Sequence, residues 1–215
     1  MPSLRYAFSM LLLAAPLAAG TVNGRVTLSE KNGQPGDASE VVIYLDGAKT
    51  KAKPVTATVT MKGKQFSPRV TVIPTGSTVA FPNEDPIFHN VFSVSGENRF
   101  DLELYKRPKS GSWTFNKAGV VRVYCNIHPQ MSAIVIVTDG PFTKAAKDGT
   151  FTLDDVPAGR YTVKTWHERG GEATAEIEVP AQGATDAQLA LDASKFKRAS
   201  HKNKFGKDYS TAETY

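Results

Sequence analysis

The sequence predicts an all-β protein, and three features support that prediction. Short runs rich in β-branched and aromatic residues recur along residues 20–192, separated by Gly, Pro and Asp. No stretch before residue 190 shows convincing helical periodicity. The composition, 40% hydrophobic and 22% charged, is typical of a globular protein. Together these features predict short strands arranged as a sandwich or a barrel.

The expected strands fall into three consecutive groups. The first group contains the runs GRVTL and VVIYL, at residues 24–28 and 41–45. The middle group is expected at residues 55–61, 69–73, 78–81, 91–94, 112–115, 120–125 and 133–137. The last group is expected at residues 151–153, 161–166, 173–179 and 186–191. Turn residues such as Pro74, Gly76 and Gly149 separate neighbouring runs.

The first 19 residues predict export. Arg5 precedes a short apolar stretch, residues 6–17, and the small residues Ala18, Ala19 and Gly20 follow, as in a secretory signal peptide. A membrane anchor is the alternative, but the apolar run is shorter than the ~20 residues of a membrane span. No second apolar run follows. The mature protein is therefore expected to be soluble and periplasmic, without a membrane span.

The charge distribution argues against a nucleic-acid-binding protein. The net charge is +5, but residues 193–215 hold six basic and two acidic residues, and Arg5 supplies one further positive charge. Residues 20–192 are neutral, with 19 basic and 19 acidic residues. A neutral body offers no surplus of charge for many phosphates. The basic tail, residues 193–215, is expected to be mobile or to lie on the surface, with a docking role as the alternative.

The single cysteine, Cys125, lies in a run of possible metal ligands. His128 and Met131 follow it with the spacing C-x2-H-x2-M, between two expected strands. His89 opens another strand 36 positions earlier and can complete the set. Two imidazoles and a thiolate, with a weak axial thioether, form a blue-copper electron-transfer site. A lone thiol is a liability in an oxidising compartment, and metal ligation gives a reason to keep it.

Other interpretations of these residues are weaker. One cysteine and two histidines also form a zinc site. Nucleophilic catalysis by Cys125 with His128 lacks a visible third orienting residue. A multicopper oxidase needs additional histidine clusters, but the sequence contains four histidines, and only His167 and His201 remain. We therefore do not expect an enzyme. His167 is expected to be structural, with a weak second metal position as the alternative.

Residues 55–138 resemble the cupredoxin family, especially its plastocyanin- and amicyanin-like members. The matching features are FSP at residues 66–68, GxTVxFxNxD at residues 76–85, His89-Asn90 and the C-x2-H-x2-M loop. The resemblance implies a Greek-key cupredoxin β-sandwich. It also implies one type 1 copper ion per chain, bound by His89, Cys125, His128 and Met131. Asn90 would tie the two ligand loops together.

The same resemblance implies single-electron transfer between redox partners. The second histidine of such a loop, here His128, would be the electron port at the surface, where a redox partner docks transiently. Candidate residues for an apolar docking patch are Pro86, Phe88, Pro129 and Gln130. The alternative functions are non-redox copper binding or delivery, and an envelope-associated binding module.

One departure from the cupredoxin pattern affects the sulfur ligand. Ile127 stands where small cupredoxins carry a proline two residues after the cysteine. Its backbone N–H is therefore available to donate to the thiolate. Hydrogen bonds to this sulfur tune the reduction potential, so the potential of amicyanin cannot be assumed for this chain.

The segments on either side resemble a carboxypeptidase-regulatory-like β-sandwich. Residues 148–163 (DGTFTLDDVPAGRYTV) match the core of that module, and GxVxL, GxP and VVIYL before residue 46 match its start. The resemblance implies that residues 20–54 and 140–192 form one small sandwich, into which the cupredoxin domain, residues 55–139, is inserted. The alternative is that residues 20–54 extend the cupredoxin sheet.

Overall fold

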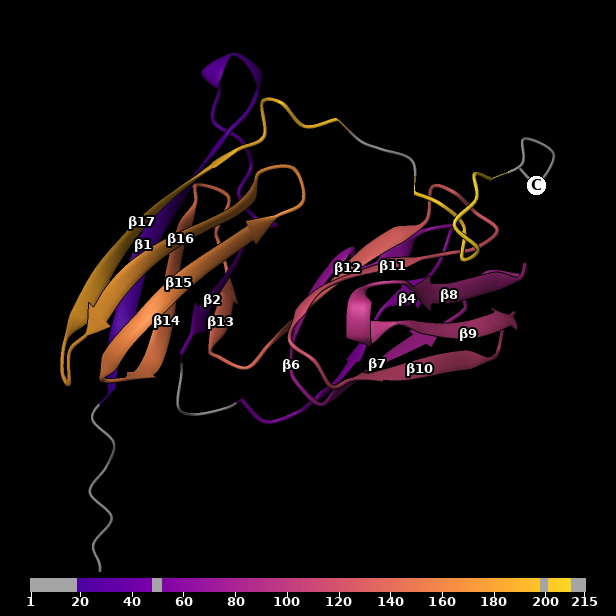
Figure 1. Ribbon diagram of the computed structural model, residues 1–215, viewed down its shortest axis with the longest axis horizontal. Helices are drawn as coiled ribbons and strands as arrows, with labels where there is room; N and C mark the ends of the chain where they lie inside the picture. Colours follow the sequence, from indigo (N-terminus) through magenta and orange to yellow (C-terminus); the bar gives the residue numbers. More distant parts are fainter. Residues whose placement is uncertain (1–18, 48–51, 198–200, 210–215) are drawn as a thin grey trace, which may run out of the picture.

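A computed structural model of the chain describes residues 19–47, 52–197 and 201–209 (Figure 1). Strands dominate, and the helical segments of the described residues are two single turns, η1 (Lys31–Gly33) and η2 (Gly96–Asn98). The all-β prediction is therefore confirmed. Within the described ranges, no helix is long and apolar enough to cross a membrane. The predicted signal peptide, apart from Ala19, lies outside these ranges.

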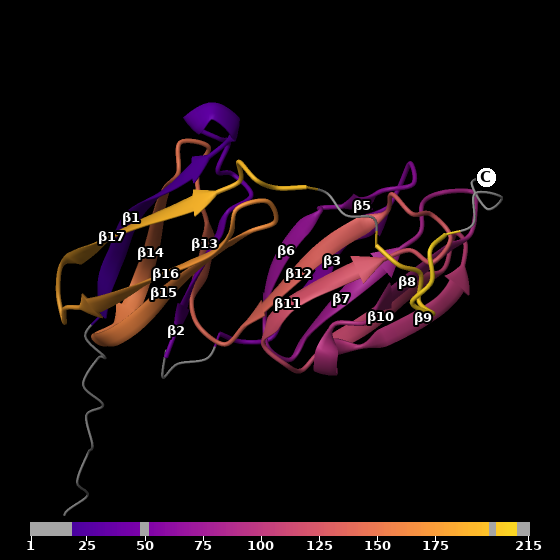
Figure 2. The same cartoon turned by 45° about the horizontal axis from the view of Figure 1, so that its top comes forward.

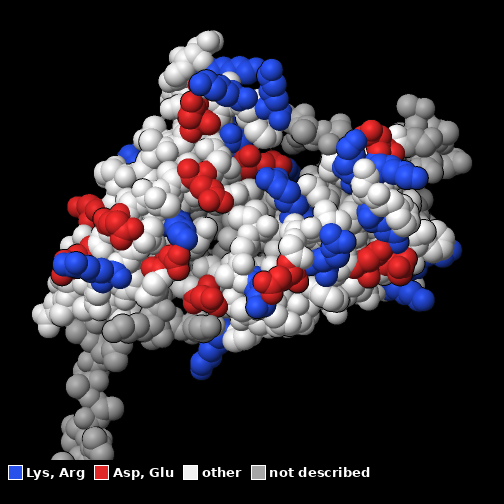
Figure 3. All heavy atoms as spheres, in the orientation of Figure 1, with Lys and Arg blue, Asp and Glu red and all other residues white. Residues whose placement is uncertain are grey.

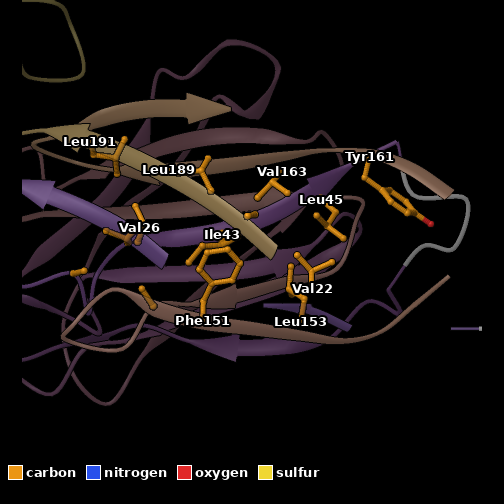
Figure 4. Close-up of a cluster of buried hydrophobic side chains, with 14 of the residues drawn as sticks. Val22, Val26, Ile43, Leu45, Phe151, Leu153, Tyr161, Val163, Leu189 and Leu191 are labelled. Atoms are coloured by element: carbon orange, nitrogen blue, oxygen red, sulfur yellow. The ribbon is translucent and has the colours of Figure 1, made fainter. Parts of the chain in front are cut away.

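The first pair of sheets combines both ends of the described chain. One sheet has the order β14 (Thr150–Pro157), β1 (Ala19–Ser29), β17 (Ala184–Asp192). The other has the order β13 (Phe142–Lys144), β2 (Val42–Asp46), β15 (Gly159–His167), β16 (Gly171–Val179). Side chains from both sheets, including Val22, Ile43 and Phe151, form one core (Figure 4). We call this unit the first sandwich.

The middle of the chain forms the second sandwich. Its larger sheet has the order β6 (Val70–Pro74), β12 (Ser132–Thr138), β11 (Gly119–Tyr124), β8 (His89–Ser93), β9 (Phe100–Tyr105). Its smaller sheet has the order β10 (Ser110–Phe115), β7 (Ser77–Pro82), β3 (Thr56–Thr58). A two-stranded ribbon joins β4 (Thr60–Met61) and β5 (Phe66–Ser67). Its core contains Phe81, Phe115 and Val123 together with Cys125 and Met131.

Strand β12 shows how the two sandwiches meet. Its sequence, SAIVIVT, is apolar on both faces because both faces are covered. Val135 faces the core of the second sandwich. Ile134 and Ile136 face the other way and join Val42 and Trp166 of the first sandwich in a separate buried cluster. A continuous apolar run here therefore marks a strand buried between two layers.

Strands β1 and β2 pair with strands that follow residue 140 rather than with the middle of the chain. This pairing places residues 19–46 beside residues 142–192. The likeness of this unit to the carboxypeptidase-regulatory-like family, and the exact domain boundaries, stay predictions.

Three strands of the structure were not expected from the sequence. They are β5, β9 and β13. Strand β9, FDLELY, lies at the edge of the five-stranded sheet and carries exposed acidic residues, so it lacks the apolar signal of a buried strand. It pairs with β8, which begins at His89. The unexpected strand therefore supports one side of the predicted metal site.

Candidate metal centre

Three of the four predicted ligands converge at one end of the five-stranded sheet. His89 opens β8, Cys125 directly follows β11, and His128 lies in the loop between β11 and β12. Because β8 and β11 are antiparallel neighbours, the start of one strand lies beside the end of the other. The ligand atoms of these residues lie within 4.8 Å of one another, and all three residues are buried.

The donor atoms of this cluster face a common centre. The Nδ1 atoms of His89 and His128 are 3.0 Å apart, and Nδ1 of His128 lies 3.6 Å from Sγ of Cys125. Ions such as Zn²⁺ bind imidazole nitrogen at about 2.0–2.1 Å and thiolate sulfur at about 2.3 Å, so donors at these separations fit around one ion. Two imidazoles and one thiolate also match the equatorial ligands of blue-copper sites. The cluster is compatible with a type 1 copper site.

Met131 ends the loop that carries the cysteine and the second histidine. Its N–H donates to the carbonyl of His128 at 3.0 Å, and its own carbonyl accepts from the N–H of Cys125 at 3.3 Å. The Met131 side chain is fully buried in the same hydrophobic cluster as Cys125. The loop is therefore closed on itself, while the role of Met131 as an axial ligand stays a prediction.

The second ring nitrogen of His89 is held by a carboxylate. Nε2 of His89 lies 2.8 Å from Oδ2 of Asp85. The Asp85 carboxylate also accepts the N–H groups of Gly63 at 2.8 Å and Lys64 at 3.0 Å. Burial alone would raise the pKa of Asp85, but the hydrogen bonds from Lys64, His89 and Gly63 outweigh it and lower the pKa. An ionised Asp85 keeps the imidazole proton on Nε2, which leaves Nδ1 free for a metal ion.

No role for Asp85 is predicted from the sequence, although it is the last residue of the GxTVxFxNxD motif. Its one available signal was the position four residues before a predicted histidine ligand. That spacing alone does not bring two side chains together outside a helix. The contact depends on the turn after β7, in which the side chain of Asn83 accepts the N–H of Asp85 at 2.9 Å.

Three backbone N–H groups surround the sulfur of Cys125. Burial, the largest effect, raises the pKa of the thiol, while the N–H groups of Asn90, Ile127 and His128 oppose it by favouring the thiolate. The N–H of Ile127 therefore favours the thiolate, in line with the absence of proline at this position. Because the net pKa shift is upward, a thiolate at neutral pH needs a bound cation to stabilise it.

Asn90, expected to tie the two ligand loops together, makes contacts through both its backbone and its side chain. Its backbone N–H favours the thiolate of Cys125. Its side-chain amide donates instead to Oδ1 of Asp101 at 2.7 Å and to the carbonyl of Glu103 at 3.0 Å. One residue thus joins β8, β9 and the cysteine.

His128 is less accessible than an electron port at the surface would be, because only 6% of it is exposed. Burial, with the nearby charges of His89 and Lys64, lowers the pKa of His128 to about 4. Its ring is therefore neutral at neutral pH and can offer Nδ1 to a metal ion. Apolar surface lies close by in the chain, since Ile87 and Phe88 are 37% and 49% exposed. Of the other predicted patch residues, Pro86 and Gln130 are exposed and Pro129 is half-buried.

The other two histidines lie outside this cluster. His167 is buried at the end of β15, and its Nδ1 accepts the N–H of Gly170 at 3.2 Å. His201 belongs to the tail and stacks on Tyr124, with ring centroids 4.0 Å apart. Neither residue joins the group of side chains that could hold an ion in the described part of the chain.

Comparisons with known proteins give one curated relative. No protein-family model matches the chain. Amicyanin from Paracoccus versutus is 37% identical over 79 residues, which cover 35% of this chain and 59% of the amicyanin. The chain therefore spans less than two thirds of the curated relative that it matches.

Similar solved structures carry copper-protein names. A purple cupredoxin from Nitrosopumilus maritimus is 24% identical, with 38% of this chain and 99% of that chain covered and a TM-score of 0.35. A Cu-containing nitrite reductase from Thermus scotoductus SA-01 is 33% identical, with 43% and 24% covered and a TM-score of 0.37. The sequence similarity to amicyanin and the buried His–Cys–His cluster support a cupredoxin, or blue copper, family for this chain.

Proposed function

We propose that this chain is a periplasmic type 1 copper protein that carries single electrons between redox partners. The observation that best supports the proposal is the buried group of His89 Nδ1, Cys125 Sγ and His128 Nδ1 within 4.8 Å of one another. A copper ion bound by two imidazoles and a thiolate supplies a one-electron couple. Met131 is proposed as the axial ligand.

The chain's own residues provide a rigid ligand set. Asp85 fixes the ring of His89, and the N–H groups of Asn90 and Ile127 favour the thiolate of Cys125. Such outer contacts orient the ligands and tune the metal. Because they come from strand ends and closed turns, the donor atoms need little rearrangement when the charge of the site changes. Little rearrangement is what an electron carrier requires.

The surface next to the cluster fits a transient partner. Ile87 and Phe88 are exposed apolar residues directly before His89, and Nζ of Lys106 lies 5.3 Å from the centre of the Phe88 ring. Electron-transfer interfaces are small and weak, so a patch of this kind is adequate. Docking near His128 therefore stays our proposal for the partner contact.

Further aspects of the proposal concern location, partners and alternative roles. Periplasmic location rests on the signal-peptide pattern of residues 1–19. Basic and acidic side chains are intermingled over the face in Figure 3, which does not favour a nucleic-acid partner. Copper delivery is less well supported than electron transfer, because the three clustered ligand residues are buried and an acceptor has little access to them. A role without enzymatic activity remains part of the proposal.

The proposal is tested by adding Cu(II) to the purified mature protein and recording visible and EPR spectra. We expect an intense blue charge-transfer band that is lost in Cys125→Ser and in His89→Gln. His167→Gln is the matched control, because it changes a buried histidine of the first sandwich, and it should keep the band. Stoichiometric zinc uptake without any blue band on copper addition would overturn the proposal.

A further inference from the structure

The basic tail returns to the metal centre. Strand β17 ends at Asp192 in the first sandwich, whereas residues 201–209 lie at the far end of the second sandwich beside β8 and β11 (Figures 1 and 2). We call residues 201–209 the C-terminal strap. This part of the basic tail therefore lies on the surface of the second sandwich, which is one of the two arrangements expected for it, and the alternative of a docking role stays a prediction.

The strap contacts three consecutive residues that include the predicted cysteine ligand. The ring of His201 stacks on Tyr124 with an interplanar angle of 20°. The hydroxyl of Tyr209 donates to the carbonyl of Cys125 at 2.8 Å. The N–H of Lys204 donates to Oδ1 of Asn126, also at 2.8 Å. The strap therefore holds both sides of the peptide bond that follows Cys125.

The strap is also attached to the other ligand loop. Nζ of Lys204 lies 2.6 Å from Oδ2 of Asp101 and 3.2 Å from Oε2 of Glu103. Asp101 in turn accepts the side-chain amide of Asn90, the residue after His89. Although exposed ion pairs contribute little on their own, the Lys204 side chain is only 21% exposed and bridges two carboxylates.

The strap has an ordered conformation of its own. The side chain of Asn203 accepts the N–H groups of Phe205 and Lys207, each at 3.0 Å, and the N–H of Asn203 donates to the carbonyl of Lys207 at 2.8 Å. This turn fixes Lys204 between its partners. His201 and Tyr209 then meet each other, with Nδ1 of His201 3.2 Å from the Tyr209 hydroxyl.

We infer that the C-terminal strap is a positioning element for the metal centre, with Tyr209 and Lys204 as its positioning residues. They hold the backbone after Cys125 in the conformation that aims the N–H groups of Ile127 and His128 at Sγ. This inference rests on the proposed function where it concerns copper. The other part of the inference, that the strap orders the ligand loop, does not depend on copper and applies to the metal-free protein as well.

The strap also has a defined electrostatic effect on the centre. The hydroxyl of Tyr209 presents the positive end of its dipole to the Cys125 carbonyl. A positive potential near the site favours the reduced, less positive form of a copper–thiolate centre. Loss of this hydroxyl therefore predicts a lower reduction potential.

Tyr209→Phe in the full mature chain is the test, and Tyr161→Phe is the matched control. The hydroxyl of Tyr161 also donates to a backbone carbonyl, that of Pro157 at 2.7 Å, but in the first sandwich. In the metal-free protein, we expect amide hydrogen exchange at residues 126–128 to become about fivefold faster in Tyr209→Phe, as for loss of a hydrogen bond worth about 1 kcal/mol. With copper bound, the reduction potential should fall. The control should change neither quantity.

A second variant covers the case in which Lys204 alone still holds the strap in place after Tyr209→Phe. Lys204→Met, alone and combined with Tyr209→Phe, removes the contacts to Asp101 and Glu103 and should accelerate exchange further. Unchanged exchange at residues 126–128 in the double variant would overturn the inference. Faster exchange with an unchanged potential would also overturn it, because the strap would then order the loop without tuning the metal. Faster exchange in a protein that forms no copper centre would refute the proposed function and leave the ordering of the loop by the strap intact.

Discussion

At the scale of single residues, the contact between Asp85 and His89 decides how the first histidine presents its metal-binding nitrogen. Asp85 is fixed from behind by the N–H groups of Gly63 and Lys64, so its carboxylate cannot swing away without losing two hydrogen bonds. The fully buried histidine ring is thereby held at Nε2, while its Nδ1 lies 3.0 Å from Nδ1 of His128. Because Asp85 orients the ring of His89, we expect the loss of its carboxylate to have a large effect on metal affinity.

We expect Asp85→Ala to weaken copper binding by about 10–100-fold, the usual effect of losing a partner of a ligating histidine. Competition with a chelator of known affinity measures the loss. Glu84→Ala is the matched control, since Glu84 is the neighbouring carboxylate and pairs with Lys62 away from the histidine. Equal losses in both variants would show that charge near the site, rather than orientation of His89, is responsible.

The N–H of Ile127 predicts a second effect at this scale. This N–H favours the thiolate of Cys125, and its positive end is expected to favour the reduced centre. Ile127→Pro removes this donor, so we expect a lower reduction potential, measured by redox titration of the blue band. Ile127→Val changes the side chain but keeps the N–H and should leave the potential close to that of the wild type. A potential that is unchanged in the proline variant would exclude this hydrogen bond as a tuning element.

At the scale of the elements, strands with apolar runs can be predicted from the sequence, whereas strands stabilised by residues far away in the chain cannot. The run AIVIV made β12 evident, because β-branched residues cover both of its faces. Strand β9 was missed because Asp101 and Glu103 occupy positions where a buried strand carries apolar residues. Their partner, Lys204, lies more than a hundred positions away in the sequence. No local pattern encodes that contact.

The metal site likewise contains residues that the local sequence predicts and residues that it does not. The C-x2-H-x2-M spacing predicted Cys125, His128 and Met131 as ligands, and His89 was added from the start of another strand. The structure brings His89, Cys125 and His128 together, while ligation by Met131 stays a prediction. The spacing did not predict Asp85 or Tyr209, because each acts through a turn or a strap whose path depends on the whole fold. The metal-binding residues can be recognised in a short stretch of sequence, whereas the residues that hold them in place come close only in the folded chain.

Packing of β7 against its neighbours gives a prediction about elements. Phe81 is fully buried, with ring centroids 6.4 Å from Phe66 and 6.2 Å from Phe100. We expect Phe81→Ala to lower the free energy of unfolding by about 3–5 kcal/mol, through lost burial and the cavity left behind. Urea denaturation measures the change. Leu104→Ala, at a residue that is 54% exposed, should have little effect, and a similar loss there would contradict the assignment of the core.

At the scale of the whole molecule, the two sandwiches are joined by an apolar interface and by polar contacts at its edge. Val42 and Trp166 of the first sandwich pack against Ile134 and Ile136 of the second. Nζ of Lys144 donates to the carbonyl of Val70 at 2.9 Å across the same junction. Arg69 and Glu168 form an ion pair there, with side chains 28% and 16% exposed. Each of the two units keeps a core of its own beside this shared interface.

Because each sandwich has a core of its own, we expect a weaker interface to let the two sandwiches unfold separately. The metal centre should stay intact. Trp166 is 4% exposed and belongs to the interface cluster rather than to the core that contains Cys125. In Trp166→Ala we expect calorimetric unfolding to separate into two transitions, because loss of a buried tryptophan costs about 3–5 kcal/mol. The blue band on copper addition should keep its position and intensity.

Trp113→Ala is the control for this experiment, because Trp113 stacks on Phe100 inside the second sandwich, with ring centroids 5.1 Å apart. It should lower the stability of that unit without resolving a new transition from weakened coupling. If Trp166→Ala instead abolished the blue band while Trp113→Ala preserved it, the metal centre would depend on the first sandwich directly. The first sandwich would then be part of the functional unit rather than a neighbour attached by its interface and the strap.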